Sequence, residues 1–439
     1  MRDAYQSTQA VPAETVNVYD SAGRVSQQTD PGGGVTVFDY SSIPGATKVT
    51  LPGNNTGARV VVDEYEAGRR IRSTDGYGTA DAVTQRFEYD PVTGGVSKVV
   101  LESVSPERVV FEAEYDRAGN VVWVEDALDR RTTYSDYDGF GQPGQVTSPD
   151  GAVTVFDYDG SGNLEGTVTT GADSTSTSVS FDLDAAHPGE VDTMIDARGK
   201  VWDFGYDDNG YLVSVLDPEG NLSSSDVDEV GRIVWSRSPK GNVAGADPEG
   251  YTTHFVTNAR GQVTSMVDPL DKPSSTVFDE LGRPERVTNA DNRVTQYHYD
   301  ALGRVDVVTR PDLSTVQTQY WPDGSVKAQI DAAGAATQYG YDAVGRSATV
   351  TDPLGRAASF EYRADGSLWW RQDPGGSCPS GPGCVVYTSD VAGQMTTATY
   401  ADPSTPDVVD VGYDARRGAG RRSRRRRGRR RSGSTGWGG

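Results

Sequence analysis

The chain has 439 residues, and its 41 basic and 63 acidic side chains give a net charge of -22 at pH 7. Such an acidic balance disfavours binding to nucleic acid or to an anionic membrane surface. Hydrophobic residues make up only 35% of the chain, while 52 glycines and 23 prolines supply dense turn signals. This composition suits a curved sheet with large wetted faces better than a solid core, and we find no helical periodicity over any long window.

The chain divides into three predicted parts. Residues 1–17 form a leading segment, and Met1–Ala10 has no apolar stretch that would act as a signal peptide. Residues 18–415 form a repeat array, and residues 416–439 form an Arg/Gly-rich tail. No run approaches the roughly 18 apolar residues of a membrane helix. We expect the chain to start and stop inside a larger array.

An anchor residue, aromatic in most units, recurs through the array. The 18 anchors stand at residues 19, 40, 65, 89, 115, 137, 158, 181, 206, 227, 257, 278, 299, 320, 341, 362, 389 and 413. Eight of the 17 intervals are 21 residues and the others are 22 to 30, which indicates loop insertions. Thirteen anchors have a glycine four residues later. Those at 40, 65, 89 and 181 fit loosely, and Ser389 is kept because Gly393 follows in register. The period indicates tandem repeats.

One unit can be interpreted in physical terms. Tyr297 and Tyr299 are expected on one face of a strand, because side chains alternate across a pleat. Asp300–Gly303 is typical of a turn, in which the aspartate bonds to backbone amides and the glycine supplies a positive φ. An extended run follows, with Val305 and Val307 predicted on one face. Each 21-residue unit is therefore one β-hairpin plus its link to the next.

Two all-β folds fit this period. Two units make 42 residues, which matches a four-stranded β-propeller blade. A blade has inner and outer hairpins in different surroundings, so its sequence should repeat every 42 residues. The units at 278, 299 and 341 look alike at both odd and even separations. The pattern therefore favours a continuous antiparallel hairpin sheet, with the β-propeller as the alternative.

The repeated motif resembles a known family. Tyr-Asp-x-x-Gly-Arg, an apolar run and then Asp-Pro-x-Gly is similar to the RHS or YD repeat, over about residues 18–415. The first part stands at Tyr19–Arg24, Phe278–Arg283, Tyr299–Arg304 and Tyr341–Arg346. The second part stands at Asp30-Pro31, Asp217-Pro218, Asp268-Pro269, Asp352-Pro353 and Asp373-Pro374. The family includes bacterial polymorphic toxins, the shell-forming component of insecticidal toxin complexes, and the animal teneurins.

The resemblance implies a structure and a role. In this family the repeats form a β-sheet that spirals into a hollow shell, and in the toxins the shell holds a C-terminal toxin domain. We therefore expect a structural shell segment of a secreted or cell-surface protein, partnered by an encapsulated toxin domain or by neighbouring repeats. The family's self-cleaving core motif is similar to Asp352–Gly355, but Arg356 and further units follow. We interpret it as an ordinary repeat turn, so neither a toxin domain nor self-cleavage is expected here.

The residues offer no catalytic constellation. His187, His254 and His298 are scattered, and His298 is expected on the sheet face opposite Tyr297 and Tyr299 as a surface residue. No Ser/His/Asp spacing or Cys/His pair stands out. We predict no catalytic residue, cofactor or metal, and an enzyme such as a glycosidase has no sequence support.

A carbohydrate-binding module is the alternative function. It would use turns and the adjacent Trp369 and Trp370 to contact cell-surface glycans. The competing interpretation of this pair places one ring packed in the sheet and the other exposed. Loss of saturable glycan binding in Trp369→Ala or Trp370→Ala would separate the two interpretations.

The two cysteines, Cys378 and Cys384, lie in one Pro/Gly-rich loop insertion. We favour a local disulfide over two free thiols. Two thiolates without a nearby histidine would leave a zinc site half empty.

The tail contains eleven arginines within residues 416–431 and no acid beyond Asp414. It could be a nucleic-acid arm. Valine, aspartate and tyrosine disappear together after Ala415, which favours a shifted reading frame or a broken gene end. In either case we expect a disordered segment.

Overall fold

The chain folds into one continuous β-sheet. The computed structural model describes residues 14–402, 404–405, 407–413 and 422–425. Within this part of the chain there are 36 β-strands and two short 3-10 helices. Every strand pairs antiparallel with the next strand along the chain. The sheet is therefore an uninterrupted meander of hairpins.

The first half of the meander contains β1 (Val16–Tyr19), β2 (Val25–Thr29), β3 (Val35–Asp39), β4 (Ala46–Asn54), β5 (Gly57–Glu66), β6 (Arg69–Asp75), β7 (Val83–Tyr89), β8 (Val96–Leu101), β9 (Arg108–Tyr115), β10 (Val121–Asp126), β11 (Arg131–Ser135), β12 (Gln145–Thr147), β13 (Val153–Tyr158), β14 (Leu164–Thr170), β15 (Ser176–Leu183), β16 (Val191–Ile195), β17 (Val201–Tyr206), β18 (Leu212–Leu216), β19 (Leu222–Val227) and β20 (Ile233–Arg237). The second half contains η2 (Pro239–Asn242), η3 (Glu249–Tyr251), β21 (Thr252–Thr257), β22 (Val263–Val267), β23 (Pro273–Phe278), β24 (Pro284–Thr288), β25 (Val294–Tyr299), β26 (Val305–Thr309), β27 (Thr315–Tyr320), β28 (Val326–Ile330), β29 (Ala336–Tyr341), β30 (Ser347–Thr351), β31 (Ala357–Tyr362), β32 (Leu368–Gln372), β33 (Cys384–Ser389), β34 (Met395–Tyr400), β35 (Val408–Gly412) and β36 (Arg422–Arg425).

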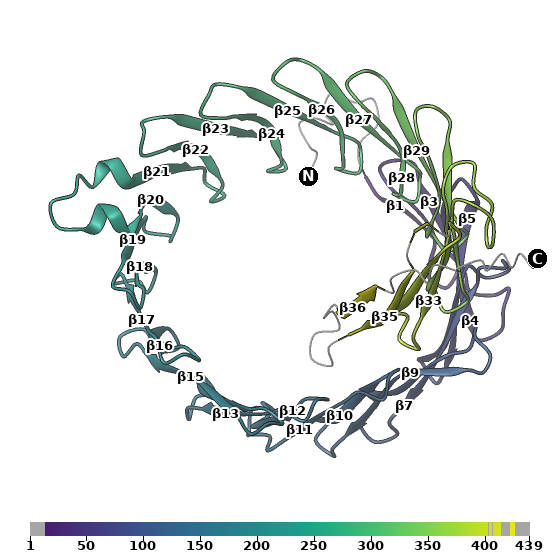
Figure 1. Cartoon of the computed structure of the whole chain (residues 1–439), viewed down its shortest axis with the longest axis horizontal. Helices are drawn as coiled ribbons and strands as arrows, with labels where there is room; N and C mark the ends of the chain where they lie inside the picture. Colours follow the sequence, from purple (N-terminus) through teal and green to yellow (C-terminus); the bar gives the residue numbers. More distant parts are fainter. Residues whose placement is uncertain (1–13, 403, 406, 414–421, 426–439) are drawn as a thin grey trace, which may run out of the picture.

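The sheet coils into a ring that overlaps itself. Figure 1 shows one revolution after which the green and yellow strands near β28 and β33 lie beside the purple strands near β3 and β5. Hydrogen bonds between residues 286 positions apart, such as Tyr341 to Asn55, join the two revolutions. The chain is thus a spiral of more than one turn, and the expected continuous hairpin sheet is confirmed. The β-propeller alternative is wrong, because the strands do not divide into separate blades.

The turn chemistry follows the sequence closely. All thirteen glycines that follow an anchor by four residues have φ between +77° and +94°. A side chain at such a position would clash with its own backbone, so glycine is the residue that the turn requires. The predicted hairpin repeat is therefore the structural unit.

A β-bulge overturns one prediction about faces. In the hairpin of β25 and β26, Val305 lies opposite Tyr299, whereas Val307 lies opposite His298. The two valines therefore belong to opposite faces, not to one face as the alternation suggested. The extra residue of the bulge shifts the register, so the side chains that follow it point to the opposite face of the sheet.

One anchor was also misplaced. The bulge of the β15–β16 hairpin falls at Leu183, and Asp184 begins the following turn. Leu183 thus holds the position that the spacing assigned to Phe181. Phe181 and Leu183 are two residues apart, so their side chains lie on the same sheet face and the repeat itself is unaffected.

The sheet is a single layer with little fully buried surface. Strands such as β27 alternate strictly between exposed and half-buried residues, so one face is covered better than the other. The largest fully buried apolar side chain among the described residues is Val62, at 2% exposure. Stability therefore comes mainly from contacts between neighbouring units, as in other repeat proteins.

The ends of the chain are described only in part. β1 begins at Val16, close to the predicted start of the array at residue 18. Within the tail expected to be disordered, only Arg422–Arg425 is described, and there it forms β36 beside β35. Residues 1–13 and the rest of the tail lie outside the described residues.

Candidate functional site: the inner face and the seam

In most units the turn that follows the anchor is built around one aspartate. In the unit of Tyr299, Asp300 Oδ1 accepts the backbone N–H groups of Leu302 and Arg304 at 2.9 and 3.0 Å. Asp300 Oδ2 accepts Nε–H of Arg304 at 2.7 Å. One carboxylate therefore satisfies the turn's amides and fixes the arginine side chain, which explains the Asp-x-x-Gly-Arg spacing.

In four units the fixed arginine meets the anchor tyrosine of the following unit. The guanidinium carbon lies 4.1–4.6 Å from the ring centre in Arg24–Tyr40, Arg283–Tyr299, Arg304–Tyr320 and Arg346–Tyr362. The tyrosine hydroxyl donates to a backbone carbonyl 15 residues earlier, as from Tyr320 to Val305 at 2.9 Å. Burial raises the pKa of Tyr320 above its ordinary value. The motif thus links each unit to the next by a cation–π contact and a hydrogen bond.

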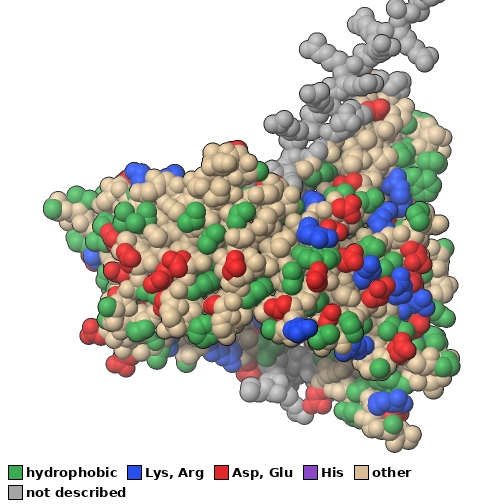
Figure 2. Space-filling view, turned by 90° about the horizontal axis from the view of Figure 1, so that it is seen from below, with side chains coloured by type: hydrophobic (Ala, Val, Ile, Leu, Met, Phe, Trp, Pro, Cys, Tyr) green, Lys and Arg blue, Asp and Glu red, His purple; other side chains and the backbone are tan. Residues whose placement is uncertain are grey.

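The anchors and the ion pairs between neighbouring strands occupy opposite faces of the sheet. Arg86 pairs with Glu102 at 2.8 Å, and Lys98 pairs with Glu112 at 3.0 Å. Arg86 precedes the anchor Tyr89 by three residues, so the two side chains point to opposite faces. Figure 2 shows the outer wall of the ring, with basic and acidic side chains gathered over the part that contains β4 to β9. These ion pairs between strands are therefore assigned to the outer face, and the anchor face to the inside of the ring.

The inner face is aromatic over much of its length. Pairs of rings two residues apart line it, among them Phe204 with Tyr206, Tyr297 with Tyr299 and Tyr339 with Tyr341. Most of these side chains are half-buried, because they converge on the concave side and cover the turn arginines. The inner surface thus combines aromatic rings with arginine guanidinium groups.

The second feature is the seam where the two revolutions meet. Here the return turns, which link one unit to the next, contact anchor turns of the later revolution. Asn55 bonds to both backbone groups of Tyr341: it accepts the N–H at 2.7 Å and donates to the carbonyl at 3.0 Å. Arg108 donates to the Asp365 carboxylate at 3.2 Å and to the Val391 carbonyl at 3.0 Å. The seam is therefore held by specific polar contacts.

The three histidines lie in different units. His187 Nδ1 lies 3.2 Å from the Asp184 carboxylate, and His254 Nε2 lies 2.9 Å from Glu249. His298 is exposed on the outer face and hydrogen-bonds with Asp306, in agreement with the expected surface position. The structure thus does not bring the histidines together. In the described part of the chain, no three His, Cys, Asp or Glu side chains are placed to hold a metal ion.

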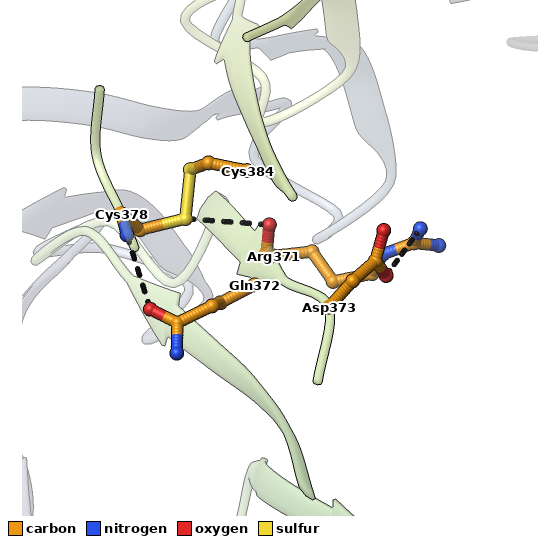
Figure 3. Close-up of a disulfide and its surroundings, with 5 residues drawn as sticks. All are labelled: Arg371, Gln372, Asp373, Cys378 and Cys384. Carbon is orange, nitrogen blue, oxygen red and sulfur yellow. Dashed lines mark hydrogen bonds and ion pairs between the residues drawn. A yellow bond between two sulfur atoms is a disulfide. The ribbon is translucent and has the colours of Figure 1, made fainter. Parts of the chain in front are cut away.

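The expected local disulfide is present. Cys378 and Cys384 are bonded, with their Cα atoms 5.2 Å apart, at the loop between β32 and β33 (Figure 3). The Cys378 N–H donates to Gln372 Oε1 at 3.0 Å, and Cys384 is 2% exposed. Cys378 Sγ also lies 3.4 Å from the Arg371 carbonyl, which is a contact only, because a disulfide sulfur carries no proton. The bond closes a return-turn insertion at the rim of the sheet.

The two adjacent tryptophans differ in their exposure. Trp369 is 40% exposed and sits at the bulge, whereas Trp370 is half-buried opposite Glu361. This is the arrangement of one packed and one exposed ring.

Asp352, the start of the segment similar to the core motif, caps its own turn. It accepts the Leu354 and Arg356 amides at 2.9 Å, as an ordinary repeat turn does.

Sequence reasoning missed the seam. Its contacts join residues more than 250 positions apart and depend on how many units complete one revolution. The one available signal was the loop insertions around Gly76 and Ser103, which lengthen the return turns that enter the seam.

Within the described residues, no helix has the length and apolar character needed to cross a membrane.

Comparisons with known proteins agree with this architecture. A family model described as RHS Repeat matches residues 115–153, 137–176, 278–315 and 320–357. No sequence match to a curated protein was found. Among solved structures, the crystal structure of TcdB2-TccC3 is 17% identical with a TM-score of 0.55, over 92% of this chain and 23% of that chain. The Tc holotoxin pore of Photorhabdus luminescens is 16% identical with a TM-score of 0.55, over 94% of this chain and 22% of that chain.

The fold and its inner face define a structural repeat protein in which β-hairpin units coil into an open shell. The chain contains RHS repeats over residues 115–176, 278–315 and 320–357, and its fold is similar to that of the solved shell chains. It spans about a fifth of the length of the solved chains that it resembles.

Proposed function

We propose that this chain is a wall segment of a hollow shell that encloses a C-terminal toxin passenger and helps to deliver it. The proposal rests on the inner face, which is lined by aromatic rings and arginines over much of its length. In this proposal the chain has a structural and not a catalytic role, and the whole protein is secreted or located at the cell surface. Its partners are the passenger and the neighbouring repeats of a longer array. The toxin-complex structures that share the fold support this proposal by similarity.

The dimensions of the ring fit such a role. Each revolution contains twelve hairpin units, so with strands about 4.8 Å apart its circumference is roughly 115 Å and its diameter about 37 Å between backbones. A folded domain of 100 residues is about 34 Å across. A passenger of this size would therefore have to touch the inner face, where Tyr297 and Tyr339 lie.

The chemistry of the inner face suits a polypeptide. Aromatic rings bury large apolar areas of a partner, and the arginines contact carboxylates or rings. These groups act without recognising one sequence, which a wall facing a variable passenger requires. The carbohydrate-binding alternative has no supporting observation, because Trp369 and Trp370 present only one exposed ring.

The test is protease protection of the passenger in the parent protein. The gene would be sequenced on both sides of this segment, and the longest open reading frame would be expressed. The polypeptide that follows the repeats should resist a protease that digests it when it is expressed alone. Double substitution Tyr297→Asp and Tyr339→Asp on the inner face should reduce this protection, whereas Gln296→Asp and Gln338→Asp on the outer face should not. Equal digestion of the enclosed and free passenger would overturn the proposal.

A further inference from the structure

Four side chains at one repeat position meet the first revolution at the seam. They stand three residues after consecutive anchors, at the tips of the anchor turns, and are called tip residues here: Leu302, Asp323, Val344 and Asp365. Along the seam they alternate between apolar and acidic. Each one contacts a different return turn of the first revolution.

The two apolar tip residues face glycines. A Cβ atom at Gly32 would lie 3.2 Å from Leu302 Cγ, and one at Gly76 would lie 2.5 Å from Val344 Cγ1. Val344 is only 9% exposed, whereas Leu281, at the same repeat position one unit before Leu302, is 50% exposed. The glycines therefore leave the space that these apolar side chains fill.

The two acidic tip residues face donors. Asn54 Nδ2 donates to Asp323 Oδ2 at 2.9 Å. Arg108 Nη1 donates to Asp365 Oδ2 at 3.2 Å, with the aspartate side chain 11% exposed. A carboxylate this covered would be unfavourable without its cation. Each tip residue is thus matched in chemistry by the return turn that it meets.

The number of repeat units between each tip residue and the return turn that it contacts is constant. The return turns belong to the first four units, with anchors at 19, 40, 65 and 89, and the tip residues belong to units thirteen to sixteen. The sequence separation varies, from 269 residues between Asn54 and Asp323 to 257 between Arg108 and Asp365. Every pair is nevertheless twelve units apart.

We propose that these tip residues determine the register in which one revolution of the spiral docks on the previous one. A shift by one unit would place Val344 against Asn54 and Asp365 against Gly76, so that an apolar group meets a donor and a carboxylate loses its arginine. Both mismatches bury polar groups without partners. A shift by two units would again place apolar tip residues against glycines and acidic ones against donors, because the two types alternate along the seam. The inference refines the proposed shell role but requires no passenger.

The first experiment separates register from curvature. Deleting Thr257–Val277 removes one whole unit outside the seam and joins Val256 to Phe278. If the tip residues set the register, the ring closes with eleven units and Asp323 still meets Asn54. If sheet curvature alone sets the size, the ring keeps twelve units and Val344 moves to Asn54.

The readout is cross-linking by a short bis-maleimide of a cysteine at position 54 with a cysteine at 323 or at 344. We expect the pair Asn54→Cys and Asp323→Cys to cross-link in both the full-length and the shortened chain. Cross-linking of Asn54→Cys with Val344→Cys in the shortened chain would overturn the proposal. Both cysteine pairs are first tested in the full-length chain, in which only the first should react.

A second experiment covers the case in which the shortened chain fails to fold. In the full-length chain, the swap Asp323→Val with Val344→Asp exchanges two tip residues without changing composition. We expect the Tyr341 amide, which donates to Asn55, to exchange with deuterium roughly tenfold faster. The matched control swap, Arg260→Leu with Leu281→Arg, uses the same repeat position outside the seam and should leave this rate unchanged. Unchanged Tyr341 exchange in the first swap would refute the register role, and neither experiment depends on the passenger.

Discussion

Removing the arginine that links two units should destabilise both of them. Arg304 donates from Nε to Asp300 Oδ2 at 2.7 Å, and its guanidinium carbon lies 4.1 Å from the centre of the Tyr320 ring. Its side chain is 27% exposed, so water screens these contacts only in part. The charged hydrogen bond contributes about 1.5 kcal/mol at the lower end of its range, and the cation–π contact contributes about 1 kcal/mol. We therefore expect Arg304→Ala to cost about 2–3 kcal/mol locally.

The coupling to Tyr320 can be isolated by a double-mutant cycle. Tyr320→Leu should cost about 1–2 kcal/mol through the lost ring and its hydrogen bond to Val305. The double variant should cost about 1 kcal/mol less than the sum of the single variants, because the cation–π contact is then removed only once. Arg304→Ala with Tyr362→Leu is the control, and its effects should add, since these residues belong to units that are not neighbours.

The assay should be local, because a long repeat array does not unfold as one two-state system. Hydrogen–deuterium exchange of the amides in β26 and β27 reports the free energy of local opening. Additive effects of Arg304→Ala and Tyr320→Leu would refute the linking role of the stacked pair.

Three further outcomes are expected. Gly303→Val should lower the melting temperature more than Ala301→Val, because Gly303 has φ +79° and strain there costs about 1 kcal/mol or more; equal melting points would contradict the turn geometry. Hydrogen bonds from Asn120 and Asn221 hold the pKa values of Asp116 and Asp217 below their ordinary 3.8. These aspartates stabilise the fold above that value, so the melting temperature should fall as pH drops below 3.8 towards the folded-state pKa values, and a flat profile there would argue against the capped turns. Deleting residues 299–340, two whole units, should leave a folded, shorter spiral with the types of the tip residues still matched, whereas deleting residues 299–309 should cause aggregation. Similar behaviour of the two deletions, tested by chromatography and circular dichroism, would show that the 21-residue unit is not the structural one.

The sequence was sufficient to predict the unit, because its determinants are local. Gly303 must adopt a positive φ and Asp300 must cap the amides of its own turn, and both requirements act within five residues. The alternation of strand residues also placed His298 correctly as an exposed residue on the face opposite Tyr297 and Tyr299.

Details that depend on neighbouring strands were predicted less well. The side chains of Val305 and Val307 were assigned to one face because alternation ignores the bulge opposite Tyr299. Phe181 was taken as an anchor in place of Leu183, because spacing and aromatic character were weighed without the turn aspartate at Asp184. A bulge depends on pairing, which a single strand's sequence does not specify.

The seam could not be predicted at all. Nothing near Asn55 indicates that it meets Tyr341, because the meeting depends on how many units complete one revolution. The twist and bend between neighbouring strands bring the two revolutions together only after many units. The tip residues become recognisable as a set only when the revolution is known.

The most direct test of the shell architecture is electron cryomicroscopy of the purified chain, enlarged by a rigid fusion for alignment. The account predicts one continuous sheet that coils past a full revolution, with the anchor tyrosines inside and Asp365 beside Arg108 at the seam. A closed disc of separate blades, or an extended ribbon in which the two revolutions never meet, would contradict it.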